Sequence, residues 1–137
     1  MTKIKLGKKE YKIYYAMQPT VQSNLLSKIA QVEEKEEWGI DNIGELFTIV
    51  AEMLLIGLQK EHKDEFGFNY ATGEGKDEVL TKAFDLLDDY SESEDANFFD
   101  LYHKLQDELL ENGFFAKMFR AEVEKAKAET EQTDSEK

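Results

Sequence analysis

The stretch DNIGELFTIVAEMLLIGLQKEH, residues 41–62, decides the fold of this chain. Apolar side chains recur in it at helical spacing, and further ones widen the apolar arc until it covers most of the helix. A helix that is apolar on most sides is usually buried against several neighbours. Glu45 and Glu52 interrupt the run, which is therefore too short for a membrane span of roughly 20 apolar residues. We predict a central core helix over 41–62, with Asp41 as its N-cap.

Two glycines lie within this predicted helix, Gly44 and Gly57. Glycine inside a helix costs about 1 kcal/mol relative to alanine. We expect that another backbone approaches closely at both positions, where a side chain would not fit.

The composition indicates one acidic domain. The chain has 137 residues, and its 17 Lys and Arg against 30 Asp and Glu give a formal net charge of −13. This balance argues against binding to a nucleic-acid backbone, which needs a basic surface. Without cysteine, neither a disulfide nor a thiolate metal site can form. The first residues, MTKIKLGKKEYKIYY, lack the apolar segment of a signal peptide, so we expect no targeting to a membrane.

Residues 3–16 are predicted to form a β-hairpin. Apolar and lysine residues alternate on both sides of Gly7 and Lys8, which suit a two-residue turn with glycine first. A lone hairpin is marginal in water, so its apolar face should pack on the helices. The opposite face carries the only basic patch of the chain, which includes Lys8 and Lys9.

The rest of the chain predicts helices around the central one. One should begin at Pro19 and run to about residue 37, with Val21, Leu25, Ile29 and Val32 on its buried face. Residues 64–75 hold three glycines and are predicted to be a loop. A helix is predicted over 77–90, with Leu80, Ala83, Phe84 and Leu87 on its buried side. The next helix should be capped by Ser93 or Asp95 and should end at Asn112 and a left-handed Gly113. A last helix is predicted to begin at Phe114.

The predicted fold is therefore α+β and predominantly α: an N-terminal hairpin followed by about five helices packed around a central apolar helix. We expect a single domain over residues 1–127, with its helical body over 19–127. Residues 128–137, AETEQTDSEK, carry no large apolar group and are predicted to be a disordered acidic tail.

Three segments resemble the tail assembly chaperones of siphophages, the small proteins encoded between the major tail protein and the tape measure protein. They are LLIGLQKEHKDEFGFNYATGEGK at residues 54–76, DLLDDY at 85–90 and LQDELLENGFFAKMF at 105–119. The N-terminal hairpin followed by helices also suits this family, and the resemblance covers most of residues 3–127. None of the three segments is a catalytic signature.

The resemblance implies an assembly role without catalysis or cofactor. Such chaperones bind the tape measure protein, keep it soluble and help to recruit major tail tube subunits in the host cytoplasm. They are absent from the mature virion. A programmed frameshift commonly adds a second domain to a minority of copies, so this chain would be the shorter, unshifted form and a partner of the longer one. Neither nucleic acid nor membrane is implied as a partner.

Two surfaces are candidates for partner or self contacts. The apolar side chains Phe114, Phe115, Met118 and Phe119 suit a varied partner surface, although residues at helical spacing more often complete a core. Lys8 and Lys9 could pair with the acidic region 85–95 of another copy in a homo-oligomer. The alternative is an ordinary solvated strand whose lysines deter edge pairing. If they pair between copies, Lys8→Glu with Lys9→Glu should weaken self-association.

Other patterns fit chemical sites poorly. A calcium loop counted from Asp89 has Glu94 where glycine is needed and Asp100 where a bidentate glutamate is needed. Gly73-Glu74-Gly75-Lys76 lacks the first glycine and the hydroxyl residue of a phosphate loop. His62 and His103 have no metal-ligand pattern nearby and are expected at the surface. We expect no enzyme. The alternative function is an acidic DNA-mimic inhibitor of a phage, suggested by the net charge and the dense acids of residues 74–111.

Overall fold

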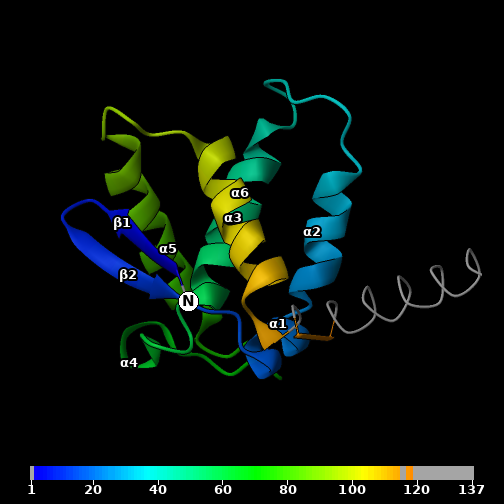
Figure 1. The fold of residues 1–137 in the computed structure, drawn as a ribbon, viewed down its shortest axis with the longest axis vertical. Helices are drawn as coiled ribbons and strands as arrows, with labels where there is room; N and C mark the ends of the chain where they lie inside the picture. Colours follow the sequence, from blue (N-terminus) through cyan, green and yellow to red (C-terminus); the bar gives the residue numbers. More distant parts are fainter. Residues whose placement is uncertain (1, 115–116, 119–137) are drawn as a thin grey trace, which may run out of the picture.

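The computed structural model describes residues 2–114 and 117–118, and it has the predicted α+β, mainly α architecture (Figure 1). In these residues a two-stranded antiparallel hairpin precedes six helices; the sequence predicted about five, of which the last, from Phe114, lies mostly outside them. In chain order, the elements are β1 (Thr2–Leu6), β2 (Lys9–Ile13), α1 (Met17–Gln22), α2 (Leu25–Glu33), α3 (Ile43–Gly57), α4 (Lys63–Phe66), α5 (Lys76–Ser91) and α6 (Phe98–Glu111).

The hairpin forms at the predicted place and with the predicted turn. Ile4 pairs with Tyr11 and Leu6 with Lys9. Gly7 has a φ of 68°, which a glycine in the first turn position adopts without strain. The alternate apolar residues of both strands are buried in the core shared with the helices, so the helices stabilise a hairpin that would be marginal alone.

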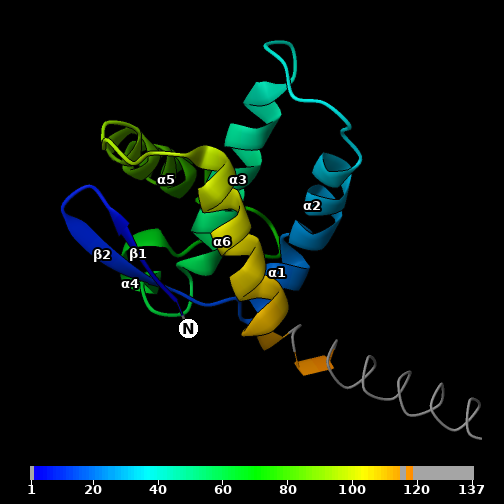
Figure 2. The ribbon, with the colours of Figure 1, turned by 45° about the horizontal axis from the view of Figure 1, so that its top comes forward.

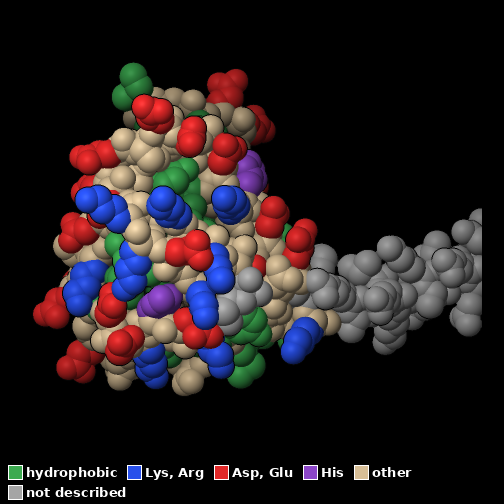
Figure 3. All heavy atoms as spheres, turned by 60° about the vertical axis from the view of Figure 1, so that its left-hand side comes forward, with side chains coloured by type: hydrophobic (Ala, Val, Ile, Leu, Met, Phe, Trp, Pro, Cys, Tyr) green, Lys and Arg blue, Asp and Glu red, His purple; other side chains and the backbone are tan. Residues whose placement is uncertain are grey.

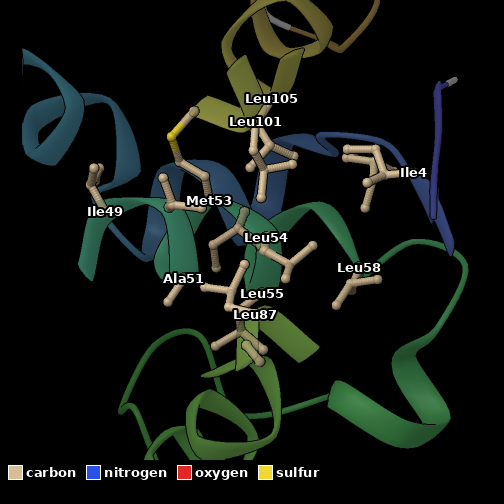
Figure 4. Close-up of a cluster of buried hydrophobic side chains, with 14 of the residues drawn as sticks. Ile4, Ile49, Ala51, Met53, Leu54, Leu55, Leu58, Leu87, Leu101 and Leu105 are labelled. Carbon is tan, nitrogen blue, oxygen red and sulfur yellow. The ribbon is translucent and has the colours of Figure 1, made fainter. Parts of the chain in front are cut away.

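The central apolar helix is confirmed as α3, which α2, α5, α6 and the hairpin surround (Figures 1 and 2). Its side chains point in several directions: Ala51 and Leu55 towards Leu87 of α5, with Leu101 and Leu105 of α6 on the other side (Figure 4). Every residue from 49 to 59 is buried. The helix is shorter than predicted, because turns replace it after Gly57.

Asp41 is not the N-cap of α3. Asn42 is the N-cap residue, but its side chain hydrogen-bonds to the preceding loop and not to the backbone of the helix. Asn42 Oδ1 accepts a hydrogen bond from Gly39 N at 2.8 Å, and its Nδ2 donates to Glu37 O at 2.8 Å.

The expectation for the two glycines is right at Gly57 and wrong at Gly44. A Cβ at Gly57 would lie 2.6 Å from Ile13 Cγ2, and Tyr14 N donates to Gly57 O at 3.0 Å. The hairpin therefore approaches α3 at this glycine. No heavy atom of a neighbouring segment lies within 4 Å of the corresponding point at Gly44.

The predicted helix from Pro19 to residue 37 is two helices, α1 and α2. Asn24 has a φ of 60°, a left-handed conformation that interrupts a right-handed helix. The side chain of Ser23 also hydrogen-bonds to Pro19 O. The break changes the direction of the chain, so that Leu25 and Ile29 remain buried whereas Val21 is 56 % exposed. The prediction of Val21 as a core residue is wrong for this reason.

The predicted loop over 64–75 contains a short helix, α4. The buried side chain of Gln59 holds it: Nε2 donates to Leu55 O at 3.0 Å and Phe66 O at 2.8 Å, while Oε1 accepts from Tyr70 Oη at 2.8 Å. Phe66 is buried in the core. The three glycines that suggested a loop all follow α4: Gly67 comes directly after it, and Gly73 and Gly75, which have positive φ, lie further along the chain.

Helices α5 and α6 occur where predicted, with three local corrections. Phe84 is exposed. Asn97 caps α6 in place of Ser93 or Asp95, accepting hydrogen bonds at Oδ1 from Phe99 N at 3.0 Å and from Asp100 N. Gly113 has no positive φ. Its role is close packing instead, since a Cβ there would lie 2.9 Å from Tyr15 O.

Most of the predicted last helix and the whole acidic tail over 128–137 lie outside the described residues. Within the described part, one cluster of buried side chains extends from Ile4 of the hairpin to Leu109 of α6. None of the helices in this part is long and apolar enough to cross a membrane.

Candidate protein-binding surface

Five aromatic side chains gather where the loop before α3 meets the first turns of α3 and α6 and the end of α5. We call this group the aromatic end; its members are Trp38, Phe47, Tyr90, Phe98 and Phe99. Phe98 lies in the middle, with its ring centroid 4.9 Å from that of Phe47 and 5.3 Å from that of Tyr90. Trp38 contacts Phe99 at 6.3 Å. All three contacts are edge-on, the arrangement that aromatic pairs prefer.

Part of the aromatic end faces solvent. Phe99 is 41 % exposed and Phe47 is 37 % exposed, while the other three rings are half-buried. Ile40, two residues after Trp38, is 99 % exposed. A single exposed apolar residue is ordinary. Several beside one aromatic cluster are typical of a surface that contacts another protein.

Two sets of hydrogen bonds join the elements next to this surface. Tyr90 Oη donates to Asn97 O at 2.9 Å and accepts from Asn97 N at 2.8 Å. Glu33 at the end of α2 accepts from Tyr102 Oη at 2.6 Å and from Gln106 Nε2 at 2.7 Å, both on α6. Burial and the Glu33 carboxylate raise the pKa of Tyr102 well above its usual value, so its hydroxyl remains a donor. The end of α5 is thus bonded to the start of α6, and the end of α2 to the middle of α6.

Many carboxylates lie near the residues of the aromatic end in the sequence. Residues 33–45 include six acidic residues and one lysine, and residues 85–100 include seven acidic residues and neither lysine nor arginine. Figure 3 shows acidic side chains over the upper end of the molecule and lysines in a band below them. Lys35 is already paired with Glu45, with a Nζ–Oε2 distance of 3.0 Å. We call the exposed carboxylates next to the aromatic residues the acidic rim: Glu36, Glu37, Asp41 and Asp100.

Lys8 and Lys9 are both exposed, but the hairpin and the acidic region 85–95 do not lie at opposite ends of the molecule. A Cβ at Gly7 would lie 3.1 Å from Asp89 Cβ, and Lys8 and Lys9 line the same shallow groove as Asp89. Lys9 Nζ is 3.4 Å from Glu65 Oε1. The charges that were predicted to attract between copies are therefore neighbours within one protomer. Pairing between copies stays a prediction, now with an intramolecular competitor.

The predicted C-terminal contact residues are only partly described. Phe114 is half-buried and its N donates to Tyr15 O at 3.2 Å, whereas Met118 is 65 % exposed. Phe115 and Phe119 lie outside the described residues. The start of this segment lies beside α1 (Figures 1 and 2), so it is remote from the aromatic end.

The buried Glu52 of α3 has two ion-pair partners. Glu52 of α3 lies 2.9 Å from Lys76 Nζ and 3.5 Å from Lys28 Nζ, which joins α3 to α5 and α2. Burial, followed by the neighbouring Lys76, lowers the pKa of Lys28. Lys76, the lysine of the phosphate-loop-like sequence, thus forms an internal ion pair.

The two histidines have different surroundings. His62 is half-buried and accepts a hydrogen bond at Nε2 from Lys12 N at 3.1 Å, so it connects the hairpin to the segment after α3. His103 is exposed as predicted. In residues 2–114 and 117–118, no three His, Asp or Glu side chains lie close enough together to hold a metal ion.

Comparison with known proteins adds no relative: the chain matches no family model, no curated protein and no solved structure. The candidate surface therefore depends on its own geometry. The sequence alone does not predict this surface, because Phe47 and Phe98 have helical spacing typical of core residues and Trp38 only follows a helix predicted to end at about residue 37. The available signal was the presence of Trp38 and Ile40 among acidic residues, between two predicted helices.

Proposed function

We propose that this protein is a phage tail assembly chaperone that binds the tape measure protein, keeps it soluble and helps to recruit tail tube subunits. The proposed partners also include a frameshifted longer form of this chain, and the proposed place of action is the host cytoplasm before the virion is complete. The role is binding without catalysis. The resemblance of residues 54–76, 85–90 and 105–119 to this family supplies the specific role.

The observation that carries the proposal is the aromatic end within its acidic rim. A chaperone for an apolar, helical polypeptide needs an apolar contact surface on a body charged enough to stay soluble. The chain combines both: Phe47, Phe99 and Ile40 are exposed on a protein of net charge −13. Trp38, Tyr90 and Phe98 pack against the core beneath, whereas Phe47 and Phe99 leave part of their rings exposed to solvent.

Co-expression tests this function. The tape measure protein encoded downstream would be produced alone, with this chain, and with an unrelated acidic protein of similar size. We expect that this chain alone increases the soluble fraction of the tape measure protein and elutes with it in size-exclusion chromatography. A tape measure protein that stays insoluble, or that the control protein solubilises equally, would contradict the proposal.

The DNA-mimic alternative has support in the acidic residues of 85–100, which carry no compensating lysine or arginine. The proteins prepared for the co-expression test also allow the two functions to be distinguished. A DNA mimic should bind a DNA-processing enzyme and be displaced by added duplex DNA, whereas a tape measure complex should be unaffected by DNA. The apolar residues among the carboxylates of the aromatic end favour the chaperone, because phosphate mimicry needs no aromatic surface.

A further inference from the structure

The aromatic end provides side chains for a partner but no strand edge. Its exposed groups come from a loop and from the first turns of two helices, α3 and α6. The strands of the described residues belong to the hairpin, which does not contribute to this surface. Strand addition is therefore unsuited to it, and the fitting mode is a helix that lays an apolar stripe across the rings.

The acidic rim determines the charge of that helix. Glu36, Glu37 and Asp41 lie next to Trp38 and Ile40 in the chain, and Asp100 follows Phe99. Among the described residues, none of these four carboxylates forms an ion pair. Lysine or arginine flanking the apolar stripe of a partner would meet them, whereas acidic flanks would be repelled.

The aromatic side chains of the site are also held in place before a partner arrives. Ring contacts fix Phe47 against Phe98 and Trp38 against Phe99, and the Asn97 cap fixes the first turn of α6. Aromatic side chains already held in place lose little conformational entropy on binding. Aromatic side chains near the centre of an interface carry much of the binding energy in many complexes.

We propose that the aromatic end is the docking site for a basic amphipathic α-helix of another protein. The apolar stripe of this helix would contact Ile40, Phe47 and Phe99, and lysine or arginine beside the stripe would contact the acidic rim. The assignment rests on the proposed function, for which it names the binding surface and the chemistry of the segment that is bound.

The single tryptophan of the chain allows a direct test. Trp38 lies within the site, so exclusion of water by a docked helix should shift its emission to shorter wavelength. The probe is a synthetic helical peptide of leucine and lysine, about 14 residues or four turns long, with leucine at helical spacing. The matched control peptide has glutamate in place of every lysine.

We expect a saturable emission shift with the leucine–lysine peptide, weaker binding at higher salt, and no shift with the leucine–glutamate peptide. Ile40→Ser should weaken binding about tenfold, as measured by calorimetry and by emission. Met17→Ser with Val21→Ser, on the exposed α1 surface, should leave binding unchanged. Glu36→Lys should weaken it more than Glu61→Lys, a change of equal charge at another exposed position.

An unchanged Trp38 emission with the leucine–lysine peptide would overturn the docking site. So would equal affinity of the wild-type protein and the Ile40→Ser variant. Because Ile40 is almost fully exposed, its replacement leaves the fold intact, and circular dichroism checks this. No tape measure protein enters the experiment, so its failure is distinct from failure of the co-expression test.

Discussion

The two halves of α3 differ in sequence and in surroundings: three of the six residues 43–48 are apolar, against seven of the nine residues 49–57. Every residue from Ile49 onward is buried, because the hairpin, α5 and α6 all reach this half. In the first half, Leu46 is buried while Gly44, Phe47 and Thr48 are exposed. One half thus forms the core of the protomer, and the other supports the aromatic end. Apolar content predicts that a surface needs cover, but it does not identify the molecule that provides the cover.

The largest loss of stability should come from a cavity in the buried second half of α3, residues 49–57. Leu54→Ala removes a fully buried side chain and should lower the free energy of unfolding by about 3 kcal/mol. Urea denaturation followed by circular dichroism measures it. Leu110→Ala is the matched control on the exposed side of α6, and its effect should stay within about 0.5 kcal/mol. Equal losses in both variants would contradict the description of α3 as the centre of the core.

Glycine-to-alanine substitution can be compared in the two halves of α3, at Gly44 and at Gly57. Gly57→Ala places a methyl group 2.6 Å from Ile13 Cγ2 and should destabilise the protein by about 1–2 kcal/mol through overpacking. Gly44→Ala meets no neighbour and should stabilise it by up to about 1 kcal/mol through helix propensity. Thermal denaturation of the two variants should give shifts of opposite sign; shifts of the same sign would remove the distinction.

The aromatic end should depend on its helix cap. Asn97→Ala removes the acceptor for Phe99 N and Asp100 N and should cost about 1 kcal/mol of unfolding free energy. Asp95→Ala, which changes one of the two residues predicted from sequence as a cap, should have almost no effect. Hydrogen exchange of the first turn of α6 would localise the change. A larger loss for Asp95→Ala would restore the original cap prediction.

The smallest effect on stability should come from the exposed loop before α3. Ile40→Ser should change the unfolding free energy by less than about 0.5 kcal/mol, because the side chain has almost no contact to lose. Thermal denaturation measures this beside the Leu54→Ala variant. A substantial loss of stability would mean that Ile40 is covered within the protomer, and the aromatic end would then be part of the core.

Local signals predicted much of the fold, and each has a local cause. Alternation and a glycine-first turn predicted the hairpin from Ile4 to Ile13, since strand and turn geometry involve neighbouring residues. Helical spacing predicted α3, α5 and α6 for the same reason. The short α4 was missed because Gln59, several residues earlier in the chain, supplies the hydrogen bonds that hold it.

The sequence by itself determined an α+β chain with an apolar central helix, a lysine-bearing hairpin and a strongly acidic character. Tertiary structure alone decided which apolar residues remain outside. Periodicity gives the position of Val21 or Phe47 around its own helix, whereas burial depends on whether another element lies against that side. The gathering of Trp38, Phe47 and Phe99 likewise required the packing of three separate segments. Distant parts of the chain meet there only because α6 packs across α3.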